Sequence, residues 1–262
     1  RDISALDRVS HVAVSDLPDH EGMVRVDVLM DVDDPVGDEA VDAVARIRAM
    51  TADHPFWVGG AAAQQTDFTN AMLDRAPWSA LIIVVAVFVL LFCMTGSLVL
   101  PLKALVINSF SLVASLGATS WFFEGGHLGL PQTPGLQTFI VACLAAFGFG
   151  LAMDYEVFLL ARISEYWQAG HENDEAVARG LQRSGRIITS AAAIIIAVFL
   201  GFVSGEMISI KELGVGLTIM VAADATLVRL LLVPATMTVL GRWNWWAPRP
   251  LAGLYGRFRQ EN

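Results

Sequence analysis

Two neighbouring side chains within a long apolar run, Asp154 and Tyr155, are of types that can carry protons inside a membrane. If Arg162 marks the end of that run, Asp154 lies about 12 Å inside it, at ~1.5 Å of rise per residue. A carboxylate at that depth is costly to ionise, and ionisable residues inside membrane segments are usually functional. A carboxyl beside a phenol hydroxyl therefore predicts a proton relay. The alternative is a neutral Asp154 that only joins helices by hydrogen bonding.

Three more ionisable residues lie in apolar runs. Glu156 lies about 200° around a helix from Asp154 and nearer the end of the run, so we expect it to reach lipid headgroups or Arg162. Asp224 and Arg229 are five residues apart, which is a poor spacing for a pair on one α-helix. We expect each to find a partner on a neighbouring helix, and a structural and a functional role remain open for both.

The hydroxyls of Thr189 and Ser190 lie early in another apolar run. Such residues usually join helices, and lining the relay is the alternative. The two cysteines, Cys93 and Cys143, also lie in apolar runs. They predict neither a disulfide framework nor a metal site.

Five long apolar runs must position these residues. The 262-residue chain has only 16% charged residues and a mean hydropathy of +0.57, whereas about a quarter of a soluble domain is charged. A helix needs about 20 apolar residues to cross a bilayer. The sequence therefore predicts five transmembrane helices, at about 77–99, 104–123, 136–161, 187–205 and 213–240.

The charge distribution predicts a domain boundary. Residues 1–75 contain 15 acidic and 6 basic residues, so they account for the whole net charge of −9, and the rest of the chain is neutral. We expect an N-terminal segment at 1–75, a membrane domain at 76–241 and a tail at 242–262. An acidic chain has little with which to neutralise phosphates, so no nucleic-acid partner is expected.

The N-terminal segment has the pattern of a small α+β unit. Alternating residues predict strands at 9–14 and 24–28, and apolar residues at helical spacing predict a helix at 37–50. A short strand at 56–58 and a polar helix at 64–75 complete a βαβ-like order. The segment is too small to form a domain alone, so we expect it to be the end of a larger extracytoplasmic domain.

Lysine and arginine predict the orientation. With an odd number of spans, the ends lie on opposite sides. Placing 1–75 outside leaves only Lys211 in the outer loops and puts Lys103 and the arginines of 162–186 and 242–259 inside, as the positive-inside rule requires. In the polar inner loop 164–185, Asn173 is expected to start a short helix on the membrane surface.

The segment from Gly150 to Arg162, GLAMDYEVFLLAR, closely resembles the signature of the MMPL family of the RND transporter superfamily. Further segments resemble the family in the same order: VGG at 58–60, EAV at 175–177, GRIITSA at 185–191, DATLVR at 224–229, LVPA at 232–235 and NWW at 244–246. Because the chain also begins at Arg1, we expect it to be a piece of a longer protein or a processed product. The resemblance implies the C-terminal portion: the end of the second porter domain and the last five helices.

The resemblance also implies a function. In the family, an Asp-Tyr pair in each half meets its counterpart at the membrane centre and carries protons. Asp154 and Tyr155 match the second-half pair, so their partners would lie in the N-terminal half of the transporter. The expectation is a non-enzymatic, proton-driven exporter of lipids or other hydrophobic molecules in the bacterial plasma membrane, in contact with membrane lipids and with no cofactor or metal.

Two alternatives remain. An intramembrane aspartyl protease using Asp154 and Asp224 would need two facing carboxyls that share a proton. The nearby Arg229, and the absence of a glycine directly before Asp154, argue against it. A lipid-sensing module that does not transport is the second alternative.

Overall fold

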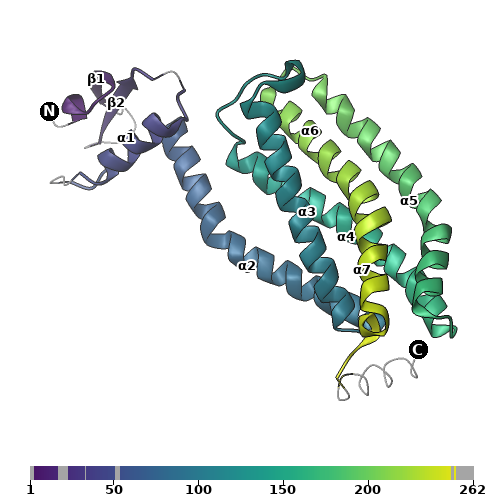
Figure 1. The fold of residues 1–262 in the computed structure, drawn as a ribbon. Coiled ribbons are helices and arrows are strands. Elements are labelled where there is room, and N and C mark those ends of the chain that lie inside the picture. The colour runs from purple at the N-terminus through teal and green to yellow at the C-terminus, as the bar shows by residue number, and fades with distance from the viewer. Residues whose placement is uncertain (1–2, 17–22, 33, 51–53, 249–250, 252–262) are drawn as a thin grey trace. The chain divides into compact units, whose positions relative to one another are not determined.

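The computed structural model describes residues 3–16, 23–32, 34–50, 54–248 and 251. The chain divides into two compact units, residues 1–80 and 81–262, and most of it is helical (Figure 1). The mainly helical fold class predicted from the sequence is confirmed. The unit boundary lies five residues beyond the change in composition.

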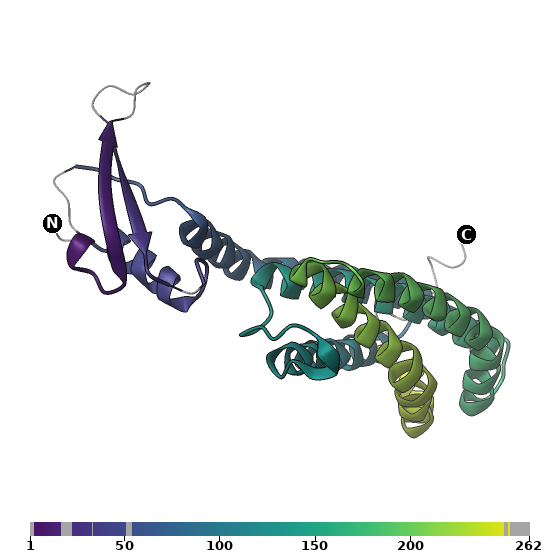
Figure 2. The ribbon, with the colours of Figure 1, turned by 90° about the horizontal axis from the view of Figure 1, so that it is seen from above.

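The first unit contains an antiparallel strand pair and a helix. Strands β1 (Val9–Asp16) and β2 (Val24–Met30) lie side by side and pair along their length (Figure 2), and α1 (Asp38–Arg48) follows. A small core joins α1 to the start of the next helix through Ala40, Val44, Ala62 and Ala63. The strand predicted at 56–58 is wrong: residues 55–59 have no regular structure. The order is therefore strand–strand–helix rather than βαβ-like.

Helix α2 (Ala61–Thr95) replaces the separate polar helix predicted at 64–75 and the first span. Pro77 lies inside it without ending it. A proline removes one backbone donor, but a helix is the only open-chain structure that satisfies the other backbone groups in an apolar medium. The helix accordingly continues past this residue to Thr95.

Four more apolar helical runs form the second unit. They are α3 (Val99–Glu124), α4 (Thr138–Gln168), α5 (Asn173–Val203) and a composite run of α6 (Ile208–Ala223), the π-helix η3 (Asp224–Leu232) and α7 (Val233–Leu240). Together with α2, five helices in the described part of the chain are long and apolar enough to cross a membrane. This confirms the predicted number of spans.

The bundle packs closely where glycine allows it. Helix α6 packs against α3, α4 and α5. A Cβ atom built on Gly214 would lie 2.8 Å from the backbone oxygen of Phe199, and one on Gly148 would overlap the Met220 side chain. The helix axes can therefore approach each other at these two contacts only because no side chain intervenes.

The connection between α4 and α5 differs from its prediction. Instead of a separate surface helix, Asn173 begins α5, which continues to Val203. The Asn173 amide donates to the Met237 carbonyl oxygen at 3.0 Å and accepts from the Trp245 indole at 3.2 Å. These bonds fasten the start of α5 to the end of the composite run, so the segment packs as part of the bundle.

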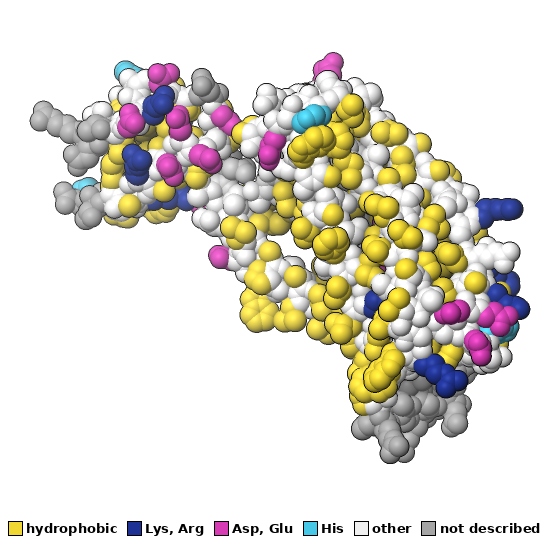
Figure 3. Space-filling model, viewed as in Figure 1, with side chains coloured by type: hydrophobic (Ala, Val, Ile, Leu, Met, Phe, Trp, Pro, Cys, Tyr) yellow, Lys and Arg dark blue, Asp and Glu magenta, His cyan; other side chains and the backbone are white. Residues whose placement is uncertain are grey.

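Apolar side chains cover most of the visible bundle surface, and charged side chains lie mainly near its ends (Figure 3). Exposed examples include Val113 at 67%, Ile194 at 66% and Val239 at 85%. Large exposed apolar surfaces mark contact with a membrane or another protein. The chain is a multi-pass membrane protein.

Candidate functional site

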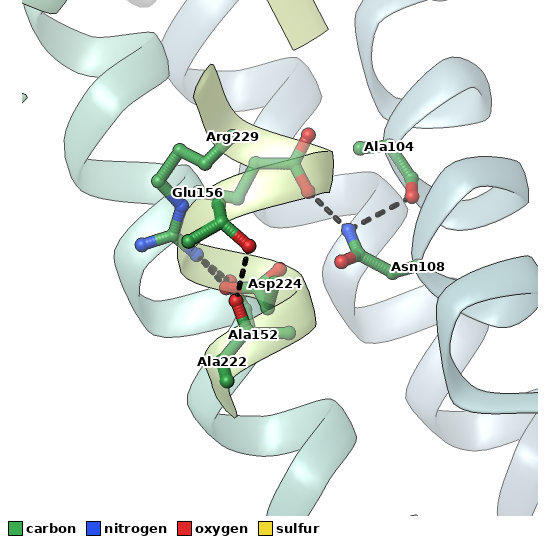
Figure 4. Close-up of polar contacts among 8 residues, drawn as sticks. Ala104, Asn108, Ala152, Glu156, Ala222, Asp224 and Arg229 are labelled. Carbon is green, nitrogen blue, oxygen red and sulfur yellow. Dashed lines mark hydrogen bonds and ion pairs between the residues drawn. The ribbon is translucent and has the colours of Figure 1, made fainter. Parts of the chain in front are cut away.

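A buried hydrogen bond joins α3 and α4. Glu156 is only 2% exposed, and its carboxylate accepts a hydrogen bond from the Asn108 side-chain amide (Figure 4). The same amide nitrogen donates to the Ala104 carbonyl oxygen at 2.9 Å. The prediction that Glu156 reaches headgroups or Arg162 is wrong, because a helical repeat gives the angle between two residues but not which side is covered.

A buried ion pair lies beside it. The Arg229 guanidinium bonds the Asp224 carboxylate and also donates to the Ala152 carbonyl oxygen at 3.2 Å (Figure 4). The two residues are 2% and 6% exposed. The prediction that each pairs with another helix is therefore wrong for the ion pair. Both residues lie in η3, and the wider π-helical turn brings residues five apart to one side.

Tyr155 lies next to this ion pair, and Asp154 precedes it on the exposed side of α4. The Arg229 guanidinium carbon lies 5.0 Å from the centroid of the Tyr155 ring, within cation–π range. Tyr155 is half-buried and Asp154 is exposed. Within the described residues, the side chain of Asp154 forms no hydrogen bond or ion pair. Glu156 and Asp154 thus lie on opposite faces of α4, one covered and one open.

Sequence reasoning missed two members of the site. Lys103 was assigned to an inner loop but lies in α3, 9% exposed, where its ammonium and the Glu156 carboxylate attract each other. Asn108 is the second of these residues. A polar amide within a membrane helix is costly unless it is hydrogen-bonded, so its position in an apolar run is the sequence signal for it.

A small cavity of about 10 Å³ adjoins this cluster between α3, α4 and the start of η3. Its wall includes Asn108, Ser111, Ala152 and Asp224. A volume of about 10–15 Å³ is the minimum for one water molecule. Among the described residues, no three His, Cys, Asp or Glu side chains gather as metal ligands would.

Thr189 and Ser190 lie apart from these contacts. Both are exposed, and both hydroxyls donate to the Arg186 carbonyl oxygen of their own helix, at 3.1 and 2.7 Å. Within the described chain they do not join α5 to another helix.

Comparison with known proteins gives a consistent result. The model of the MMPL family matches residues 8–260. A Streptomyces coelicolor protein described as a membrane protein is 46% identical over 85% of this chain and 32% of its own length. In Mycolicibacterium smegmatis, the trehalose monomycolate exporter MmpL3 is 38% identical over 80% of this chain and 21% of its own length. The mycolic acid-containing lipids exporter MmpL11 of that organism is 40% identical over 73% and 20%.

Proposed function

The chain belongs to the MMPL family, and from this premise we propose that it is the C-terminal part of a transporter that exports lipids or other hydrophobic molecules. It spans about a fifth to a third of the length of the curated relatives it matches. Two of those relatives are named as lipid exporters. The activity belongs to the complete protein, of which residues 1–80 would be the end of an extracytoplasmic porter domain.

The proton gradient drives export in this proposal, through Asp154 and Tyr155. The observation that supports it is the placement of Asp154 on an open face of α4, without a partner in the described chain. An isolated carboxyl in an apolar span is costly, so a partner from the missing N-terminal half is the simplest way to complete the site. Protonation there would change the charge at the contact between the halves.

The two alternatives are less well supported. Asp224 is ion-paired with Arg229, whereas an aspartyl protease needs two carboxyls sharing one proton. A lipid-sensing module that does not transport would need no proton coupling, so the replacement of Asp154 described below separates it from the exporter. In the proposed orientation, the N-terminal unit faces outward from the bacterial plasma membrane and the C-terminal end lies inside.

The deciding experiment replaces Asp154 in the complete transporter. Cells carrying equal membrane amounts of the parent or a variant are fed radiolabelled acetate, and labelled lipid reaching the cell surface is measured. Asp154→Asn keeps the volume but cannot exchange a proton, so we expect export to be abolished. Tyr155→Phe removes only the hydroxyl and should reduce export.

Glu165→Gln is the matched control, because Glu165 lies on the same helix and its ion pair among the described residues, with Arg162, is at an exposed position. It should export at the parent rate. Parent-level export by Asp154→Asn would end the relay proposal and leave Asp154 as a structural residue.

A further inference from the structure

Four charged side chains are buried together inside the bundle. Lys103 comes from α3, Glu156 from α4, and Asp224 and Arg229 from η3, and none is more than 9% exposed. Two are basic and two acidic, so the fully ionised cluster is neutral. Burying charges is costly even when they are paired. The cost also depends on whether the remaining polar atoms of these side chains have hydrogen-bond partners.

With the neighbouring Asn108 counted in the cluster, five of its polar atoms have no hydrogen-bond partner within the described part of the chain. They are Lys103 Nζ, Asn108 Oδ1, Glu156 Oε1, Asp224 Oδ1 and Arg229 Nη1. Each unsatisfied buried donor or acceptor costs about 1–3 kcal/mol, and more when charged. Both donors and acceptors are unmet in one place, and buried water usually serves such groups. The small cavity beside Asn108 and Asp224 is at the lower limit of volume for one water molecule, and its exposed lining is apolar.

The two acids of the cluster differ in how firmly their negative charge is held. Asp224 bonds directly to a guanidinium, which is always protonated. The hydrogen-bond donor of Glu156 is the neutral Asn108 amide, and the cation acting on it, Lys103, attracts it without a hydrogen bond. Of the two carboxylates, Glu156 is therefore the one whose negative charge is not stabilised by a direct ion pair.

We propose that Glu156 is a second proton-binding carboxyl of the membrane domain, in a buried cluster separate from Asp154. Lys103 and Asn108 of α3, and Asp224 and Arg229 of η3, are the charged and polar groups that surround it. Lys103 lies about 6 Å along the axis from the first residue of α3, at ~1.5 Å per residue, so the cluster starts near one end of the bundle. At its other side, Arg229 contacts the ring of Tyr155.

The cluster therefore connects a bundle end with the residue next to Asp154. A role of this cluster in transport rests on the proposed function, whereas proton binding by Glu156 does not depend on it. A test of proton binding consequently separates the two proposals.

Infrared difference spectroscopy of the complete protein in lipid vesicles tests this directly. A protonated carboxyl has a carbonyl stretching band that an ionised one lacks, and spectra at a series of pH values show when it forms. We expect one such band to be lost in Glu156→Gln and retained in Asp154→Asn. In deuterium oxide the band should shift as the carboxyl exchanges its proton for a deuteron.

A second variant keeps the Glu156 carboxyl while changing its surroundings. Lys103→Gln removes the nearby cation that favours the ionised carboxylate, so the band should form at a higher pH. Glu165→Gln is the control and should leave the midpoint unchanged. A titration unaffected by both Glu156→Gln and Lys103→Gln, or a band that stays unshifted in deuterium oxide, would overturn the proposal. If the Glu156 band is present but the Asp154→Asn variant still exports, the proposed relay through Asp154 is wrong and the proposal for Glu156 stands.

Discussion

At the scale of single residues, the ion pair between Asp224 and Arg229 gives the clearest energetic consequence. Its charges are almost fully buried, so Arg229→Met would leave a carboxylate without its cation. We expect the free energy of unfolding to fall by roughly 3 kcal/mol, as when one member of a buried pair is removed. Reversible unfolding of the complete protein in detergent micelles measures this.

The double variant Asp224→Leu/Arg229→Met is the control for this prediction. It removes both charges and fills the site with apolar atoms, which is often neutral or stabilising. We expect it to recover most of the lost stability. A double variant as unstable as the single one would mean that the loss comes from packing rather than from an unpaired charge.

The candidate site was only partly predictable from the sequence. Asp154 and Tyr155 were identified because an acid in an apolar run is conspicuous at any helix orientation. The burial of Glu156 and Lys103 was not predictable, since one helix cannot report which of its faces its neighbours cover. The pairing of Asp224 with Arg229 depends on the π-helical turn, which residue spacing alone does not indicate.

At the scale of elements, the contact between α5 and α6 depends on a missing side chain. Gly214→Ala would bring a Cβ atom within 2.8 Å of the Phe199 backbone oxygen, and a backbone atom cannot move aside as a side chain can. We expect a loss of about 1–3 kcal/mol in stability, typical of overpacking, measured by the same unfolding assay.

The matched substitution is Gly201→Ala on α5, where an added Cβ meets nothing within 4 Å. It should be neutral or stabilise the helix by up to about 1 kcal/mol, because alanine has the higher helix propensity. Equal losses in the two variants would contradict the close-contact explanation.

The elements were more predictable than the site, for a physical reason. Twenty or more apolar residues can satisfy their backbone only as a helix in a membrane, so the five spans followed directly. The strand predicted at 56–58 failed because a strand needs a partner, and the partner cannot be identified from three apolar residues. The surface helix near Asn173 failed because the bonds of that residue to Met237 and Trp245 connect distant segments.

At the scale of the whole molecule, the predicted orientation awaits its test. In the complete protein with all native cysteines replaced by serine, Cys93 and Cys143 included, Val14→Cys and Trp243→Cys introduce exposed single thiols. A maleimide that cannot cross membranes should label position 14 in intact cells and position 243 only after permeabilisation. The opposite pattern would invert the topology.

The π-helical turn also bears on insertions and deletions. Removing one residue from an α-helix rotates everything beyond it by about 100°. A deletion in α6 would therefore turn the fully buried Met237 of α7 away from the core. In η3, loss of the exposed Leu227 could instead convert the wide turn into an ordinary α-helical one. Asp224 and the arginine would then be four residues apart, still neighbours on one face. We therefore expect this stretch to tolerate a change in chain length that the flanking helices cannot.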